Sequence, residues 1–161
     1  MAELVPGTKA PPATLPRLSG GEVALPGSSP LTLLAFYKAS CPTCRWAAPF
    51  VQSLHAKTKG GSLAVVGVAE DDEDTARQFA DELGLDFPIA VETEPWAVST
   101  SYGLATVPTF FLVDNEGEIL LTSPGFARDD LREVARRAAE LSGGEPADPF
   151  DGADVPPFRP G

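Results

Sequence analysis

The chain has 161 residues, of which 43% are hydrophobic, and a formal net charge of −11. This size and composition predict one globular domain with a full core, and the acidic charge disfavours nucleic acids and anionic membrane surfaces, which require basic patches. The sequence has no run of about 18 apolar residues that could cross a membrane. Residues 1–7 lack the basic and apolar regions of a signal peptide. We therefore expect a cytoplasmic protein, and we expect it to be a monomer.

Apolar periodicity and turn residues predict a β-hairpin followed by a β–α–β unit in the first half of the chain. Ser19-Gly20-Gly21 is the turn signal of the hairpin, and prolines confine this hairpin to a sheet edge. The long helix contains Pro49, where we expect a kink. The two strands joined by this helix should be parallel. These elements are the hairpin segments 13–18 and 22–25, strand 31–37, the helix from about residue 42 to 59, and strand 63–69.

The second half of the chain alternates helices and strands and ends in a hairpin and a helix. The acidic run 70–74 could hold a metal, but it fits better at a helix N-terminus, where carboxylates cap the helix and oppose its dipole. The turn at residues 114–117 predicts antiparallel pairing of the strands on either side. The elements are a helix ending at residue 83, a short strand at 87–91, a helical turn within 94–102, a strand ending at 113, strand 118–122, and helix 128–141.

The last 19 residues differ in composition from the rest of the chain. Residues 143–161 contain five prolines, four glycines and four acids. Such a segment has too little apolar surface to fold alone. We therefore predict a folded domain of residues 1–142 and a disordered acidic Pro/Gly-rich tail of residues 143–161.

The only two cysteines lie in the motif Cys41-Pro42-Thr43-Cys44, between the predicted strand 31–37 and the following helix. The first turn of a helix has free N–H groups and the positive end of the helix dipole. Both favour a thiolate and lower its pKa from about 8.5 toward about 7 or below. Cys41 is therefore the predicted nucleophile, and Cys44, one turn further on, is the predicted resolving thiol. Pro42 suits the first helical position, where its missing N–H costs nothing.

A zinc site and an inert pair of thiols are the alternatives to a redox-active dithiol. Structural zinc usually needs four Cys or His ligands, but the chain has no second CxxC motif and one histidine, His55. In a reducing compartment a lone CxxC is more often catalytic than structural. We therefore favour a dithiol that cycles through a Cys41–Cys44 disulfide, and we expect no metal and no other cofactor.

The order strand, Cys-Pro-Thr-Cys, kinked helix, strand, helix, Val107-Pro108-Thr109, hairpin and helix resembles the thioredoxin-like superfamily. The N-terminal hairpin and segment 70–102 make the chain more similar to the TlpA/ResA-like or AhpC/TSA (redoxin) branch than to a minimal thioredoxin. The resemblance covers about residues 4–142. It implies an α/β thioredoxin-like fold, in which helices flank a mixed central sheet and an N-terminal β-hairpin is an extension.

The resemblance also implies the layout of a site. The peptide bond before Pro108 would be cis and lie beside the dithiol, so that the backbone of Val107 can pair with an extended substrate strand. The substrate would be a protein or small-molecule disulfide, and an upstream thiol reductant would restore the dithiol. Cys41 and Cys44 would be catalytic, and the residues that shape the site or bind substrate would be Ser40, Pro42, Thr43, Val107 and Pro108.

Three positions depart from the family pattern. Ser40 stands where thioredoxin has a Trp, Ala35 replaces its buried Asp, and Ala47 replaces the acid of ResA-type proteins. These acids help to move the proton of the second cysteine, so that Cys44 lacks an evident base. The candidate substitutes are Glu92 and Glu94.

The leading hypothesis is a thiol–disulfide oxidoreductase that works by dithiol/disulfide exchange. One alternative is a peroxiredoxin-type thiol peroxidase with an antioxidant role, although Lys38 stands where those enzymes have Thr or Ser, and no arginine lies in a central strand. The other alternative is a non-catalytic redox-sensing or adaptor module.

Overall fold

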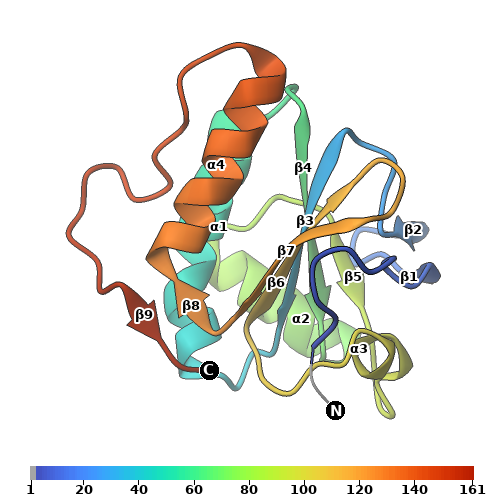
Figure 1. Cartoon of the computed structure of the whole chain (residues 1–161). Coiled ribbons are helices and arrows are strands. Elements are labelled where there is room, and N and C mark those ends of the chain that lie inside the picture. Colours follow the sequence, from blue (N-terminus) through green and yellow to red (C-terminus); the bar gives the residue numbers. More distant parts are fainter. Residues whose placement is uncertain (1–2) are drawn as a thin grey trace.

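The computed structural model of the chain, which describes residues 3–161, has a five-stranded mixed sheet with helices on both faces (Figure 1). The strand order in this sheet is β5-β4-β3-β6-β7, and β1-β2 and β8-β9 form two small separate sheets. The strands are β1 (Ala13–Pro16), β2 (Glu22–Leu25), β3 (Leu31–Tyr37), β4 (Leu63–Ala69), β5 (Ile89–Val91), β6 (Thr109–Asp114), β7 (Ile119–Pro124), β8 (Phe126–Ala127) and β9 (Phe158–Arg159). The helices are α1 (Pro42–Thr58), α2 (Glu73–Leu83), α3 (Ala97–Ser101) and α4 (Arg128–Ser142).

The central strand is β3, which pairs in parallel with β4 and antiparallel with β6. Leu34 lies opposite Val66 on one side and Phe111 on the other. All seven residues of β3 are buried, as expected for a continuously apolar strand that is covered on both faces. The predicted mixed sheet and the predicted N-terminal hairpin, β1-β2, are thus confirmed.

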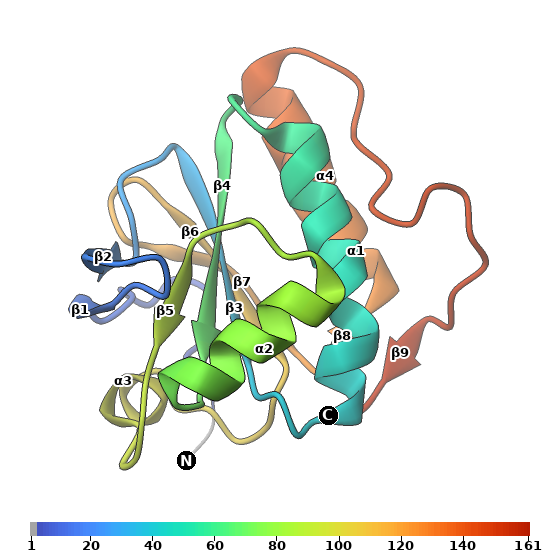
Figure 2. The same cartoon turned by 180° about the vertical axis from the view of Figure 1, so that it is seen from behind.

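The two faces of the sheet carry separate cores, because successive side chains of a strand point in opposite directions. Leu33 and Ala35 belong to the core under α1, α2 and α4, whereas Leu34 and Phe36 belong to the core under the N-terminal segment and α3. Figures 1 and 2 show α1 and α4 side by side on the first face, with the β1-β2 hairpin and α3 on the opposite side. The dithiol therefore lies on the face that carries the long helices.

The helix ends follow local sequence signals. Asp72 caps α2 by accepting a hydrogen bond of 2.8 Å from the Thr75 N–H, and Gly84 ends it in the left-handed region with φ of 65°. The acidic run at residues 70–74 therefore begins a helix, as expected from its composition. The longest helix, α1, continues through Pro49. Among residues 3–161, no helix combines the length and the apolar character needed to cross a membrane.

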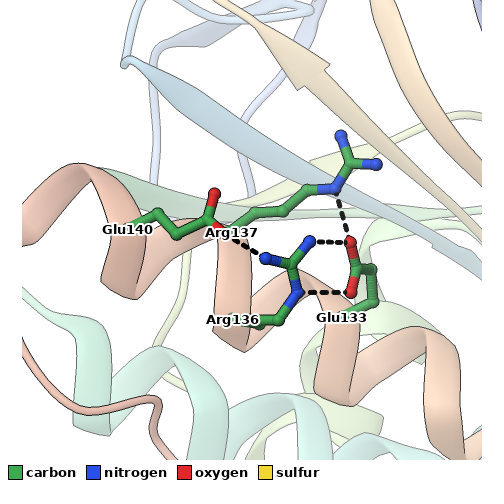
Figure 3. Close-up of polar contacts among 4 residues, drawn as sticks. All are labelled: Glu133, Arg136, Arg137 and Glu140. Atoms are coloured by element: carbon green, nitrogen blue, oxygen red, sulfur yellow. Dashed lines mark hydrogen bonds and ion pairs between the residues drawn. The ribbon is translucent and has the colours of Figure 1, made fainter.

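The outward face of α4 carries a cluster of ion pairs (Figure 3). Arg136 donates hydrogen bonds of 2.7 and 2.5 Å to the two carboxylate oxygens of Glu133, and Arg137 donates one of 2.9 Å. These two guanidinium groups lower the pKa of Glu133 to about 2. Arg136 also pairs with Glu140. Because the cluster is exposed to solvent, screening keeps its contribution to stability small.

The tail, residues 143–161, packs in part against the domain, whereas its composition predicts disorder. Phe150 and Val155 are buried at 2% and 6% exposure. The Phe150 ring packs against Phe50 of α1 and Phe126 of β8, with ring centroids 5.1 and 5.9 Å apart. The composition of the tail prevents it from folding alone, but its few apolar side chains complete a core that the domain supplies. Figure 1 shows the tail running beside α1 and α4 before it ends near the start of α1.

Candidate active site

The strand-to-helix connection between β3 and α1 places Cys41 at the N-terminus of α1. Cys41 is the N-cap residue, with extended φ and ψ of −90° and 115°, and Pro42 occupies the first helical position. The Cys41 Sγ accepts a hydrogen bond of 3.1 Å from the backbone N–H of Cys44. A cysteine sulfur thus takes the role that Ser, Thr or Asp oxygens usually have at a helix N-cap. Cys41 is partly exposed, and its sulfur lies at the N-terminal end of α1, where the first-turn N–H groups have no partner within the helix.

Cys44 lies one turn further along α1 and is 2% exposed. Both cysteines are free thiols in this structure. Burial raises the pKa of the Cys44 thiol well above its ordinary value, and the hydrogen bond with Cys41 adds to the rise. The negative charge of Glu70 acts in the same direction. The two sulfurs therefore differ in access to solvent, and Cys44 stays protonated at neutral pH.

The loop before β6 supplies the other wall of the site. The Cys41 thiol donates a hydrogen bond of 3.4 Å to the backbone carbonyl of Val107, which joins residues 66 positions apart in the sequence. The Val107–Pro108 peptide bond is cis, and Pro108 is buried. The Pro108 carbonyl accepts a hydrogen bond of 2.7 Å from the Gly125 N–H. The structure thus brings Cys41, Cys44 and Val107 together, in the arrangement that the family resemblance implies.

The remaining predicted site residues have different surroundings. Ser40 and Pro42 are exposed on the connection that leads into α1. Thr43 is 6% exposed, and its Oγ1 donates a hydrogen bond of 2.7 Å to the Pro160 carbonyl. Thr43 therefore holds a segment of the tail, which sequence reasoning did not anticipate.

The acids proposed as substitute bases are not placed to serve Cys44. Glu92 is buried, but its carboxylate accepts hydrogen bonds from the N–H groups of Val98 and Ser99 and from the Ser99 hydroxyl, so that it caps α3. Glu94 is exposed. The suggestion that one of them replaces the missing acid therefore finds no support in the contacts of these two side chains.

Glu70 and Asp71 are the acids that lie near the dithiol, at the end of β4. The Glu70 N–H donates a hydrogen bond of 2.9 Å to the Tyr37 carbonyl, the last residue of β3. Asp71 accepts one of 2.9 Å from the Ala39 N–H. Burial raises the pKa of both carboxyl groups. Their position could have been predicted, because the carboxyl ends of parallel strands meet at one edge of the sheet.

A groove of about 310 Å³ lies beside Val107. Lys38 is one of its walls, and its ammonium group lies 4.5 Å from the centroid of the Trp96 ring. The positive charge of Lys38 lowers the pKa of Glu70 and Asp71, which partly opposes the effect of burial. The groove is lined by Lys38, Glu70, Trp96, Leu104, Thr106 and Val107, among others.

The end of the tail lies against Val107, the residue whose carbonyl accepts the hydrogen bond from Cys41. A Cβ atom added at Gly161 would overlap the Val107 carbonyl oxygen, which shows how closely the two backbones approach. The Arg159 guanidinium lies 5.0 Å from the centroid of the Trp46 ring on α1. The sequence does not predict these contacts of the tail, because a Pro/Gly-rich composition indicates disorder and only a few residues make the contacts. Within residues 3–161, no group of three or more His, Cys, Asp or Glu side chains is arranged to hold a metal ion.

Comparisons with known proteins show the family to which the chain belongs. Residues 6–121 match the model of the AhpC/TSA family. The chain is 28% identical over 116 residues to the thiol-disulfide oxidoreductase ResA of Bacillus thuringiensis, covering 71% of this chain and 66% of ResA. It is 33% identical over 118 residues to the thioredoxin-like protein YneN of Bacillus subtilis, covering 70% of this chain and 68% of YneN. The chain thus spans just under two thirds of the length of ResA.

A solved structure extends the similarity to most of the chain. A Chlorobium tepidum protein, proposed to be the thiol:disulfide interchange protein DsbE, superposes with a TM-score of 0.76 at 29% identity. The superposition covers 87% of this chain and 99% of that chain. The fold and the paired cysteines at the start of α1 define a thioredoxin-like protein with a CxxC dithiol. The chain belongs to the AhpC/TSA family, as its sequence pattern indicates.

Proposed function

We propose that this protein is a thiol–disulfide oxidoreductase in which Cys41 attacks a disulfide and Cys44 releases the product. The observation that carries the proposal is the unequal pair of sulfurs at one helix start. Cys41 is partly exposed and its sulfur accepts a hydrogen bond of 3.1 Å from the Cys44 N–H, whereas Cys44, one turn further along α1, is 2% exposed. The similarity to ResA and to the DsbE-like structure supports the same reaction.

The first step forms a mixed disulfide. The Cys41 thiolate attacks one sulfur of the substrate disulfide, a bond forms between these two sulfurs, and the other substrate sulfur leaves as a thiolate. The Cys44 N–H that points at the Cys41 Sγ stabilises negative charge on the attacking sulfur. The half-exposed position of Cys41 gives the substrate access to this sulfur.

The second step releases the substrate and closes the protein disulfide. Cys44 loses its proton and attacks the Cys41 sulfur, and the remaining substrate sulfur leaves as a thiolate. The substrate has then gained two electrons, and the protein holds a Cys41–Cys44 disulfide. Because burial favours the protonated Cys44 thiol, this step requires that the proton be removed. A thiol reductant must then restore the dithiol.

The backbone of Val107 is the proposed docking point for the substrate. Its carbonyl oxygen lies 3.4 Å from the Cys41 sulfur, so that a peptide that pairs with this backbone brings its disulfide to Cys41. Extended peptides commonly bind by adding backbone hydrogen bonds to an exposed edge. The proposed partners are therefore a protein or small-molecule disulfide and a thiol reductant.

Reduction of insulin by the protein with dithiothreitol as electron source tests the proposal. We expect the wild-type protein to accelerate the precipitation of insulin chains, and Cys41→Ser to remove the acceleration, because a hydroxyl group does not form the thiolate nucleophile. Ser53→Ala on the same helix is the matched control, and we expect it to retain the wild-type rate. Equal rates for wild-type and Cys41→Ser proteins would refute the function.

A further inference from the structure

We propose that residues 158–161 occupy the place where a protein substrate docks, so that this segment lowers the rate with protein disulfides and leaves small disulfides free to react. This inference rests on the proposed function and adds the control of access to the same site. The segment is part of the protein itself, and its backbone contacts two of the residues expected to guide a substrate, Thr43 and Val107.

The first part of the tail is an anchor, residues 148–155. Phe150 is buried between Phe50 and Phe126, and Val155 is buried at 6% exposure. Asp148 closes a turn by accepting hydrogen bonds of 2.9 and 2.8 Å from the N–H groups of Phe150 and Gly152. The buried apolar area fixes this part of the chain on α1 and β8. The anchor therefore keeps the following residues near the dithiol.

The last part of the tail lies along the entrance to the dithiol. β9 pairs antiparallel with β8, with Phe126 opposite Arg159 and Ala127 opposite Phe158. Beyond β9, the Pro160 carbonyl accepts the 2.7 Å hydrogen bond from Thr43, between the two cysteines. Gly161 then lies against the Val107 carbonyl, which also accepts the hydrogen bond from the Cys41 thiol. A substrate peptide cannot use this carbonyl while Gly161 contacts it.

The contacts of this last part are few, so that a substrate can displace it. β9 has two residues, and the Phe158 side chain is 54% exposed. Arg159 is held over the Trp46 ring at 5.0 Å rather than in a buried ion pair. Segments with few buried apolar contacts open more readily than the core. The anchor and the last part therefore differ in how firmly they are held.

The size of the substrate decides whether the segment matters. A small disulfide needs to reach only Cys41, a residue that stays partly exposed with the tail in place. A protein disulfide carries backbone on both sides of its sulfur and must use the surface that residues 158–161 cover. The fraction of molecules with the segment displaced then multiplies the rate with the protein substrate only.

Two variants remove the segment in different ways. Deletion of residues 158–161 removes it outright. Gly161→Ala keeps the chain length but places a Cβ that overlaps the Val107 oxygen and lies 2.6 Å from the Thr106 Oγ1, so that the backbone of residue 161 must move away. Gly144→Ala is the matched control in the same tail, because a Cβ there meets no atom within 4 Å.

The test compares the rate of insulin reduction with the rate of reaction with a small aromatic disulfide, 5,5′-dithiobis(2-nitrobenzoic acid). We expect both variants to raise the insulin rate about fivefold, the population ratio that one net hydrogen bond typically supplies. The small disulfide should react at the wild-type rate, and Gly144→Ala should match wild type with both substrates. Insulin rates equal to wild type in both variants, with normal rates for the small disulfide, overturn the proposal and leave the function intact.

A second readout separates this inference from the proposed function. Cys41 is alkylated either with N-ethylmaleimide or with a polyethylene-glycol maleimide, and peptide mapping measures the rate of each reaction. We expect the variants to speed the bulky reagent about fivefold relative to the small one. If no protein exchanges any disulfide, the proposed function fails, and this alkylation ratio alone supports or overturns the covering role of residues 158–161.

Discussion

The rim of the site and the core beneath it hold one sulfur each, and their surroundings are opposite. At the rim, Cys41 is half-exposed and faces the Val107 carbonyl and the end of the tail. In the core, Cys44 is 2% exposed among the apolar residues that α1 packs against β3. Two cysteines that lie three residues apart in sequence thus differ in their surroundings: Cys41 is accessible, and Cys44 is inaccessible and protonated. In the proposed mechanism, this difference in burial sets the order in which the two sulfurs react.

Replacement of each sulfur in turn gives the largest expected difference between rim and core. Cys41→Ser should lower disulfide exchange by about 10³-fold or more, the scale that loss of a nucleophile produces. Cys44→Ser should retain the first step and accumulate a mixed disulfide between Cys41 and the substrate. Mass spectrometry of acid-quenched reactions measures this adduct. An adduct on Cys44 in the Cys41→Ser protein would reverse the assignment.

A second comparison uses the two phenylalanines of the tail. Phe150→Ala removes a buried ring from the anchor and should lower the free energy of unfolding by about 3 kcal/mol. Phe158→Ala, at an exposed position, should change it by about 0.5 kcal/mol or less. Urea unfolding followed by tryptophan fluorescence measures both. Equal effects of the two substitutions would contradict the division of the tail into an anchor and a displaceable end.

The pH dependence of the second step reports the burial of Cys44. The folded protein raises the pKa of this thiol, so that at neutral pH only a small fraction is thiolate. Between pH 6 and 8 the release of substrate should therefore accelerate about tenfold per pH unit, in proportion to the thiolate fraction. Decay of a preformed mixed disulfide in stopped flow gives this rate. A rate independent of pH over this range would show that loss of the Cys44 proton does not limit release.

The smallest expected effect comes from Glu70. Its negative charge contributes to the raised pKa of Cys44, so that Glu70→Gln should lower this pKa and speed the second step about twofold at pH 7. Glu94→Gln, at an exposed acid, is the matched control and should have no effect. A slower second step in Glu70→Gln would instead show that the carboxylate takes the proton of Cys44.

The sequence predicts the parts of the molecule that depend on local patterns. The apolar run 31–37 is the buried strand β3, the acidic run 70–74 contains the Asp72 cap, and Cys41 caps the N-terminus of α1. Their physical causes act within a few residues, so that periodicity and capping rules reveal them. The position of Val107 beside Cys41, 66 residues away, followed from the family resemblance.

The parts that depend on distant contacts were predicted less well. Glu92 was named as a possible base, but its hydrogen bonds to α3 could not be foreseen from its surroundings in sequence. In the sequence, Glu70 is the first residue of the acidic run 70–74, and nothing in that run indicates that its charge acts on Cys44. The low apolar content of the tail predicts disorder. Phe150 is nevertheless buried, because α1 and β8 provide an apolar surface on which its ring packs. Composition describes what a segment can do alone and says little about what it gains from a neighbour.

Equilibration of the cysteine pair with mixtures of reduced and oxidised glutathione tests the central claim most directly. Acid quenching, alkylation and mass spectrometry then count free thiols, glutathione adducts and the internal disulfide. The account predicts one transition between the dithiol and the Cys41–Cys44 disulfide, with a midpoint between about −120 and −270 mV, the range of thiol–disulfide exchange proteins. Two thiols that stay reduced at every ratio, or a lasting glutathione adduct on Cys41 with Cys44 free, would contradict it.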